Sequence, residues 1–243
     1  MQNNKVAIVT GGSKRLGRGI VMALSENGFD VIVNYNKSRS TADLTIKQIK
    51  EMGRRAFSIK ADISKKIDVS RLVKSTLKRF GRIDLLVNNS AIFIESPFKK
   101  TTQKIWDTTI NINLKGSFLC SQAVAPIMLK QKGGKIINIA SVSGLVGWKK
   151  YFPYSISKAG VIMLTRLLSK ELAPHIQVNA IAPGYIEIPE NENQIKNKMP
   201  KGKILLQKYG SIKDITDMLI YLSNTSEYIT GQVITIDGGR SIN

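Results

Sequence analysis

A phenol, an amine and a hydroxyl stand at a spacing suited to proton transfer onto a carbonyl. Tyr154 and Lys158 are four residues apart, and Ser141 lies thirteen residues before Tyr154. On a helix, the phenol and the amine share one face, one turn apart. A neighbouring ammonium stabilises a phenolate and lowers the tyrosine pKa, which suits Tyr154 to general acid chemistry near neutral pH. We expect the Ser141 hydroxyl to hold the carbonyl oxygen against that phenol. Many solvated helices carry a Tyr-x-x-x-Lys pair, so its meaning depends on the rest of the chain.

The N-terminal segment has the pattern of a dinucleotide cradle. The apolar run 5–10 is typical of a buried parallel strand, and an amphipathic helix is expected over 16–27. A glycine-rich turn joins the two. Its glycines let the backbone approach a pyrophosphate, whose charge faces the N-terminus of the helix. The turn residues that we expect to contact a cofactor are Gly11, Ser13, Lys14, Arg15, Leu16 and Gly17.

Strand and helix patterns alternate along the 243 residues, with no linker or repeat between them. We expect strands near 5–10, 30–34, 55–60, 83–88, 134–140, 176–182 and 232–236. We expect helices near 16–27, 41–52, 67–80, 102–132, 154–173 and 211–222. Repeated β-α units with right-handed crossovers predict an α/β protein: a single-domain Rossmann fold with a doubly wound parallel sheet of about seven strands and helices on both faces. The ligand crevice should then lie beyond the carboxyl ends of the strands.

The composition bounds the class of protein. No apolar run reaches the roughly 18 residues that a membrane span needs, and the start of the chain has no signal-peptide pattern. The single cysteine, Cys120, excludes an internal disulfide and is typical of a reducing compartment, so we expect a cytoplasmic protein. Cys120 lies on an apolar helical stretch, which predicts a packed thiol. Together with the single histidine, His175, it argues against a His/Cys metal site.

The net charge of +20 has two interpretations. It would attract phosphorylated or acidic partners such as NADP, coenzyme A, acyl carrier protein or nucleic acid. Alternatively, it reflects a lysine-rich solvated surface. We favour the second interpretation, because the cations run through the whole chain and no recognition helix or zinc-finger spacing organises them. Nucleic acid is therefore not an expected partner.

Motifs along nearly the whole chain resemble the short-chain dehydrogenases/reductases, and most of all the bacterial 3-oxoacyl-[acyl-carrier-protein] reductases. In chain order, the matching segments are Thr10-Gly11…Gly17, Ala61-Asp62-Ile63, 86–89, 113–116, Ser141, Tyr154, Lys158, Pro183-Gly184 and 229–239. The resemblance implies hydride transfer from NADPH to a carbonyl carbon, with Tyr154 protonating the oxygen. It further implies that Lys158 binds the nicotinamide ribose, and that Asn113 is a fourth catalytic residue holding a water that links Lys158 to solvent. The further cofactor contacts that it implies are Asp62, Ile63, Asn89, Ser90, Ala91, Tyr154, Lys158, Pro183, Gly184 and Ile186.

The segment after the second strand predicts the choice of nicotinamide cofactor. Sites that prefer NAD carry Asp or Glu there, where the carboxylate binds the ribose hydroxyls. This chain has Asn36, Lys37 and Ser38 instead. With Lys14 and Arg15 from the first turn, these side chains suit a 2′-phosphate, so we expect NADPH.

The chain departs from the family pattern in three segments. Arg15 stands where the family usually has glycine, as in a subgroup that includes pteridine reductases, whose arginine helps hold the cofactor phosphates. Those enzymes commonly carry aspartate at the position of Ser141. Asn89-Ser90-Ala91 replaces the usual Asn-Ala-Gly. Ile188 replaces a threonine that binds the nicotinamide amide in many relatives, so that hydrogen bond is expected to be missing or replaced.

The substrate remains open. The polar segment 185–208 is expected to form a lid, which suits either a small substrate or a long pantetheine arm. One hypothesis is an NADPH-dependent reductase of 3-oxoacyl thioesters on acyl carrier protein or coenzyme A. A second is a reductase of another carbonyl, such as a sugar, quinone or pterin. A third is a catalytically silent protein that binds nucleotides or nucleic acid. Apolar helices around 118–125 and 161–168 predict subunit interfaces, and by resemblance a homotetramer.

Overall fold

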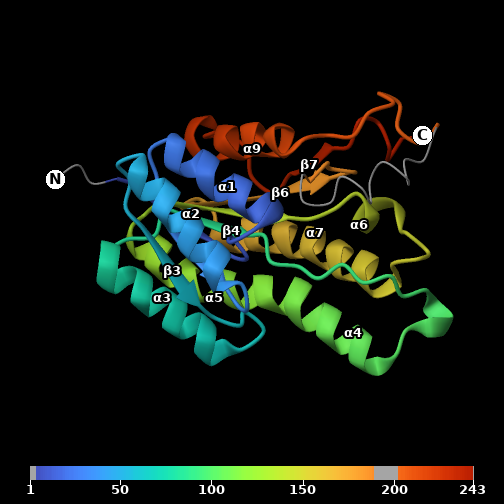
Figure 1. Cartoon of the computed structure of the whole chain (residues 1–243), viewed down its shortest axis with the longest axis horizontal. Coiled ribbons are helices and arrows are strands. Elements are labelled where there is room, and N and C mark those ends of the chain that lie inside the picture. The colour runs from blue at the N-terminus through green and yellow to red at the C-terminus, as the bar shows by residue number, and fades with distance from the viewer. Residues whose placement is uncertain (1–3, 189–201, 243) are drawn as a thin grey trace.

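The computed structural model describes residues 4–188 and 202–242, and a parallel sheet of seven strands runs through its centre (Figure 1). The strands lie in the order β3-β2-β1-β4-β5-β6-β7, and every neighbouring pair is parallel. They are β1 (Val6–Val9), β2 (Asp30–Tyr35), β3 (Ala56–Lys60), β4 (Leu85–Asn88), β5 (Gly134–Ile139), β6 (Ile176–Pro183) and β7 (Val233–Ile236). The predicted fold class is confirmed, since the order reverses next to β1 as a doubly wound sheet requires.

Helices cover both faces of the sheet because the strand residues alternate between them. Ala7 and Val9 pack with apolar residues of α1, α2 and α9, whereas Ile8 packs with α3 and α5 on the opposite face. One layer therefore consists of α1 (Arg15–Glu26), α2 (Arg39–Glu51) and α9 (Ile212–Ile220). The other consists of α3 (Lys66–Phe80), α5 (Gly116–Lys130) and α7 (Phe152–Leu172), as Figure 1 shows.

The helix expected over 102–132 is present but is not regular. It begins as α4 (Gln103–Ile110), passes through a π-helical turn at Asn111–Lys115 and continues as α5. A π turn carries one extra residue, which rotates the following side chains relative to a 3.6-residue repeat. In this turn Asn113 is buried. Periodicity alone does not indicate such an insertion. The short helix α6 (Ser143–Val146) was likewise not predicted.

The thiol of Cys120 is a core group, as the apolar pattern predicted. It is buried between sheet and helices with Val124 and Met128. Burial disfavours the thiolate and raises the pKa of Cys120 to about 12, so this thiol is not a nucleophile.

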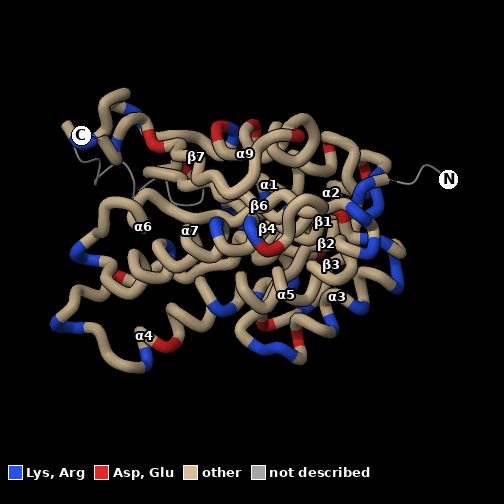
Figure 2. Tube along the Cα trace, turned by 180° about the vertical axis from the view of Figure 1, so that it is seen from behind, with Lys and Arg blue, Asp and Glu red and all other residues tan. Residues whose placement is uncertain are grey.

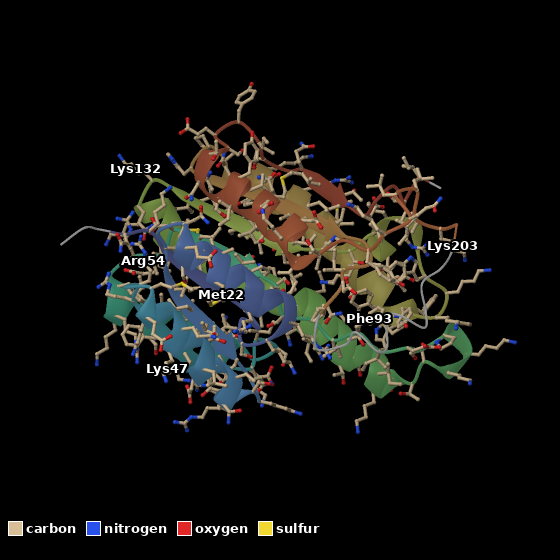
Figure 3. All side chains as sticks on the ribbon, turned by 45° about the horizontal axis from the view of Figure 1, so that its top comes forward. Met22, Lys47, Arg54, Phe93, Lys132 and Lys203 are labelled. Atoms are coloured by element: carbon tan, nitrogen blue, oxygen red, sulfur yellow. The ribbon has the colours of Figure 1, made fainter. Side chains whose placement is uncertain are left out.

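The basic residues are spread over both ends of the molecule (Figure 2). Lys47, Arg54 and Lys132 lie at one end and Lys203 at the other, as Figure 3 shows. This spread favours a solvated lysine-rich surface over one concentrated basic patch. Within the part of the chain that the structure describes, no helix is both long and apolar enough to cross a membrane.

Candidate active site

A cleft of about 750 Å³ opens beyond the carboxyl ends of the strands. This volume lies within the range of roughly 300–1,000 Å³ that ligand sites occupy. Of the candidate residues from the sequence, only Asn113 does not line it. The candidate residues that do line the cleft are Gly11, Ser13, Lys14, Arg15, Leu16, Gly17, Asn36, Lys37, Ser38, Asp62, Ile63, Asn89, Ser90, Ala91, Ser141, Tyr154, Lys158, Pro183, Gly184 and Ile186.

The glycine-rich turn brings backbone close to backbone. Gly11 has a φ of +61°, a conformation that favours glycine. A Cβ on Gly17 would collide with the carbonyl oxygen of Gly11 and lie 2.6 Å from Nδ2 of Asn89. The Asn89 amide donates to the carbonyls of Thr10 (2.9 Å) and Gly11 (3.3 Å). Asn89 thus braces the turn with its side chain while it also lines the cleft.

The N-terminus of α1 faces the cleft without a protein group to cap it. The capping position, Lys14, makes no side-chain hydrogen bond to the helix, and the first turn contains no acidic residue. Arg15 has a φ of +51°, in the left-handed region that side chains other than glycine rarely adopt. Such a conformation costs about 1–2 kcal/mol, and strained residues of this kind cluster at functional sites. Free N–H groups, the helix dipole and two cationic side chains together fit the phosphates of a dinucleotide.

The charge of the cleft is predominantly positive. Lys14, Arg15, Lys37 and Lys158 line it, and Asp62 is the one acidic residue among the described residues that line it. One oxygen of the Asp62 carboxylate is already engaged, since Oδ1 accepts from the backbone N–H (3.1 Å) and the hydroxyl (2.7 Å) of Ser64. The cleft therefore favours an anionic ligand.

Asn34 connects three strands at this edge and was missed by the sequence reasoning. Its Oδ1 accepts from the backbone N–H of Gly11 (3.2 Å), and its Nδ2 donates to the carbonyls of Ile59 (3.3 Å) and Ala61 (3.1 Å). A polar residue inside the apolar run of β2 was the available signal, because a buried amide needs partners.

Ser141, Tyr154 and Lys158 meet in one wall of the cleft. Ser141 follows β5, whereas Tyr154 and Lys158 lie on successive turns at the start of α7. The Nζ of Lys158 lies 5.7 Å from the centroid of the Tyr154 ring and donates to the carbonyl of Ile139 at 2.6 Å. The Ser141 hydroxyl accepts from the backbone N–H of Ser143 (3.2 Å) and is 3.1 Å from its hydroxyl. Backbone groups thus hold both the amine and the serine hydroxyl.

Burial, not the neighbouring amine, dominates the pKa of Tyr154. Desolvation raises that pKa to about 12, while a hydrogen bond with Ser141 acts in the opposite direction. The pKa of Tyr154 is therefore raised, not lowered as expected, because the cost of burial exceeds any stabilisation of the phenolate by Lys158. Desolvation also lowers the pKa of Lys158 to about 8. The phenol accordingly holds its proton at neutral pH, and the amine is mostly charged.

The side chain of Asn113 is engaged by the protein, not by the cleft. Its Oδ1 accepts from the N–H of Ile92 (2.8 Å), and its Nδ2 donates to the Ile92 carbonyl (3.0 Å) and to Oγ of Ser157 (3.0 Å). Both amide hydrogens are used, so the side chain has no donor left for the expected water. The geometry supports a positioning role toward the loop after β4.

Aromatic side chains line the cleft around Tyr154, and the sequence reasoning missed them. Phe93, Trp148 and Tyr185 come from the loops after β4, before α7 and after β6. The aromatic run that precedes Lys158 was a partial signal, but nothing local linked it to the other two segments.

The expected lid over 185–208 is described only in part, because residues 189–201 lie outside the described ranges. Its start is fixed by two backbone hydrogen bonds, from Gly210 to the carbonyl of Tyr185 (2.9 Å) and from Glu187 to that of Gly210 (2.7 Å). Ile188 lines the cleft, where its hydrocarbon side chain has no group to hydrogen-bond a cofactor amide.

Comparison with known proteins agrees with this geometry. A model of the short chain dehydrogenase family matches residues 5–199. The chain is 39% identical over 239 residues to a 3-oxoacyl-[acyl-carrier-protein] reductase from Synechocystis sp., covering 97% of this chain and 96% of that protein. It is also 39% identical over 251 residues to the (2S)-[(R)-hydroxy(phenyl)methyl]succinyl-CoA dehydrogenase subunit BbsD of Thauera aromatica, covering 98% of this chain and 97% of that protein.

Solved structures share the whole fold. The acetoin dehydrogenase from Enterobacter cloacae superposes with a TM-score of 0.90 at 33% identity, covering 98% of this chain and 96% of that one. The structure of gox2181 gives a TM-score of 0.93 at 32% identity over 99% of this chain and 96% of that one. The chain therefore belongs to the short-chain dehydrogenase family and is an oxidoreductase that acts on CH–OH or C=O groups.

Proposed function

We propose that the protein is an NADPH-dependent reductase that converts a 3-oxoacyl thioester, carried by acyl carrier protein or coenzyme A, to the 3-hydroxyacyl form. The observation that carries this proposal is the convergence of Ser141, Tyr154 and Lys158 in one wall of a cationic cleft. The relatives named 3-oxoacyl-[acyl-carrier-protein] reductase, at 39% identity over nearly the whole chain, support the substrate class.

The nucleotide end of the cleft would hold NADPH. The glycine-rich turn and the uncapped start of α1 would bind the pyrophosphate. Asn36, Lys37 and Ser38 after β2, with Lys14 and Arg15, would bind the 2′-phosphate, and no carboxylate among them repels it. When bound, the nicotinamide supplies the hydride and leaves as the oxidised cofactor.

Ser141, Tyr154 and Lys158 supply the proton and control its transfer. The phenol of Tyr154 is protonated at neutral pH and gives its proton to the carbonyl oxygen, which becomes the hydroxyl. The Ser141 hydroxyl orients that oxygen by a hydrogen bond. The ammonium of Lys158 lies 5.7 Å from the phenol ring and stabilises the phenolate that remains. Asn113 positions the loop after β4.

We further propose that the chain acts as one nucleotide-binding domain, with a lid near 185–208, in a homotetramer. Exposed apolar side chains on α5 (Phe118, Leu129) and α7 (Met163, Leu167) support one two-fold interface. The edge strand β7, at the end of the sheet, would supply the second. Two different two-fold interfaces generate a closed tetramer.

A second candidate is the reduction of another carbonyl, and the aromatic lining of the cleft favours it. Phe93, Trp148 and Tyr185 offer apolar rings beside the phenol of Tyr154. The relative named for a hydroxy(phenyl)methyl succinyl-CoA is as similar to this chain as the named 3-oxoacyl-[acyl-carrier-protein] reductases are.

The test is oxidation of NADPH by the purified protein, followed by absorbance, with acetoacetyl-coenzyme A and a panel of ketones. NADH is run in parallel, and Tyr154→Phe is the inactive control. We expect turnover with acetoacetyl-coenzyme A. Turnover confined to other ketones would contradict the proposed substrate class, but the protein would still be a reductase. No turnover with any carbonyl, together with a salt-sensitive shift of RNA on a gel, would favour the silent binding protein instead.

A further inference from the structure

We propose that the substrate carries a flat aromatic group on its carbonyl carbon, and that this group binds against the rings of Phe93, Trp148 and Tyr185. We call these three side chains the aromatic wall. The inference rests on the proposed reductase function and names the substrate class within it, namely 3-aryl-3-oxoacyl compounds.

Phe93 presents a partly exposed ring beside the proton donor. It follows β4, is labelled in Figure 3, and lies edge to face with Tyr154 at 4.7 Å between ring centroids and 77° between planes. Tyr151 stacks on it at 4.0 Å and 13°. Phe93 nevertheless remains 53% exposed, although an aromatic side chain of this size is usually buried. A ring held in place by its neighbours and open to the cleft is a ready stacking partner.

Trp148 and Tyr185 form the second part of the wall. Their rings stack at 5.4 Å and 16°. The guanidinium of Arg240 lies over both, 5.7 Å from the Trp148 ring and 5.0 Å from the Tyr185 ring. Its Nη1 also donates to the carbonyl of Lys203 at 3.1 Å. Arg240 does not itself line the cleft, so it supports the two rings from outside.

Further apolar side chains belong to the lining of the same cleft. Ile94, Ile112 and Ile188 add hydrocarbon surface. Asp62, which is the one acidic residue among the described lining residues, lies after β3, with the nucleotide-binding segments. An apolar group that extends from the carbonyl toward this surface gains by leaving water, and a flat ring gains further by offset or edge-to-face packing.

Hydrogen bonds hold the backbone at two points of the aromatic wall. The backbone of Ile92, next to Phe93, is held on both sides by Asn113. The backbone N–H of Trp148 donates to Oγ of Ser155 on α7 at 3.1 Å. Rings that are already ordered lose little conformational entropy when a ligand binds. The energy of stacking therefore contributes to the affinity for a flat ligand.

The experiment compares two substrates of similar size, one with a flat ring and one with a puckered ring: ethyl 3-oxo-3-phenylpropanoate and ethyl 3-cyclohexyl-3-oxopropanoate. The two ketones differ in intrinsic reactivity, so the quantity compared is the ratio of their kcat/KM values between variants. In Phe93→Leu, which keeps an apolar side chain but removes the ring, we expect the phenyl-to-cyclohexyl ratio to fall about two- to tenfold. The loss should lie mainly in KM.

Phe98→Leu is the matched control. Phe98 is an exposed phenylalanine of the same loop region, packs edge to face on Phe152, and does not line the cleft. Its ratio should equal that of the wild type. A Phe93→Leu ratio equal to the wild-type ratio, or one matched by the control, overturns the inference while leaving the reductase function intact.

A binding measurement separates the two proposals if no substrate is turned over. Trp106→Phe leaves Trp148 as the one remaining tryptophan of the two. Its fluorescence is titrated with benzamide and with cyclohexanecarboxamide, which are not reduced. Tighter binding of benzamide that depends on Phe93 supports the aromatic wall even where the reductase function fails. Equal binding of the two amides overturns the wall.

Discussion

The side chain of Asn113 satisfies both backbone hydrogen-bonding groups of Ile92. It accepts from the Ile92 N–H at 2.8 Å and donates to the Ile92 carbonyl at 3.0 Å. The buried Asn113 side chain thus makes the two hydrogen bonds to the Ile92 backbone that a neighbouring β-strand would make. Since Phe93 comes next, this pair of bonds helps to place its ring in the cleft, together with the packing of that ring on Tyr151 and Tyr154.

Asn113→Ala should therefore lower the free energy of unfolding by about 2–3 kcal/mol, because two backbone groups lose their partners. The KM for the ketone should rise more than the KM for NADPH, as the displaced loop lies at the substrate end. Urea unfolding and steady-state kinetics measure the two effects. Asn111→Ala, in the same turn, is the control. An equal rise in both KM values would contradict the positioning role.

Tyr154→Phe should reduce turnover by about 10²- to 10⁴-fold and leave NADPH binding nearly unchanged, because only the proton donor is lost. Turnover follows from NADPH oxidation and binding from NADPH fluorescence. Tyr151→Phe is the matched control. It removes a hydroxyl three residues earlier in the chain and keeps the ring that stacks on Phe93. A Tyr154→Phe enzyme with most of the wild-type turnover would remove Tyr154 from the role of acid.

The buried amine of Lys158 should make stability depend on pH. Its pKa falls from 10.5 to about 8 on folding, so between these values the unfolded chain binds more protons. Stability contributed by this group then increases as pH rises through that window and is lowest below it. Relative to Lys158→Met, the wild type should gain about 2–3 kcal/mol between pH 7 and pH 10.

Urea titrations at several pH values would check this gain. They should stop near pH 10, because the pKa of Tyr154 rises from 10.0 to about 12 on folding, so its contribution decreases with pH above that point. Lys170→Met, an exposed lysine on the same helix, controls for the loss of one charge. A constant difference between wild type and Lys158→Met would contradict the prediction.

Asn36→Asp should lower kcat/KM for NADPH at least about tenfold, because a carboxylate would face the 2′-phosphate. The value for NADH should hold or rise, since the carboxylate can accept from the ribose hydroxyls. Asn27→Asp makes the same change in charge at the far end of α1. Equal efficiency of the wild type with both cofactors would show that the interpretation of this pocket is wrong.

Light scattering at micromolar concentration should give the mass of a tetramer for the wild type. Leu167→Glu on α7 should produce smaller, less active species, since that helix also carries Tyr154 and Lys158. Leu44→Glu is a matched control, because Leu44 on α2 is 63% exposed and Leu167 is 57% exposed. A stable, fully active wild-type monomer would rule the assembly out.

The features predicted from the sequence are those encoded by contiguous residues. The strand, glycine turn and helix of 5–26 follow from local patterns. The four-residue spacing of Tyr154 and Lys158 places these two side chains on the same face of one helix. The π turn was not predictable, because its extra residue is not visible in an apolar pattern that continues on both sides of it.

The aromatic wall and the pKa of Tyr154 depend on tertiary packing. Phe93, Trp148 and Tyr185 are separated along the chain by at least 37 residues, and only the sheet order brings their loops together. The spacing of Tyr154 and Lys158 indicated a nearby charge but gave no measure of burial, and burial has the larger effect.

Arg15 has a consequence for how this protein would respond to selection for heat resistance. Its left-handed backbone would be relaxed by glycine, so Arg15→Gly should be among the substitutions that raise the melting temperature. The same replacement removes one of the cations that we assign to the choice between the two nicotinamide nucleotides. At this single residue, a higher melting temperature and a preference for NADPH over NADH therefore require different side chains.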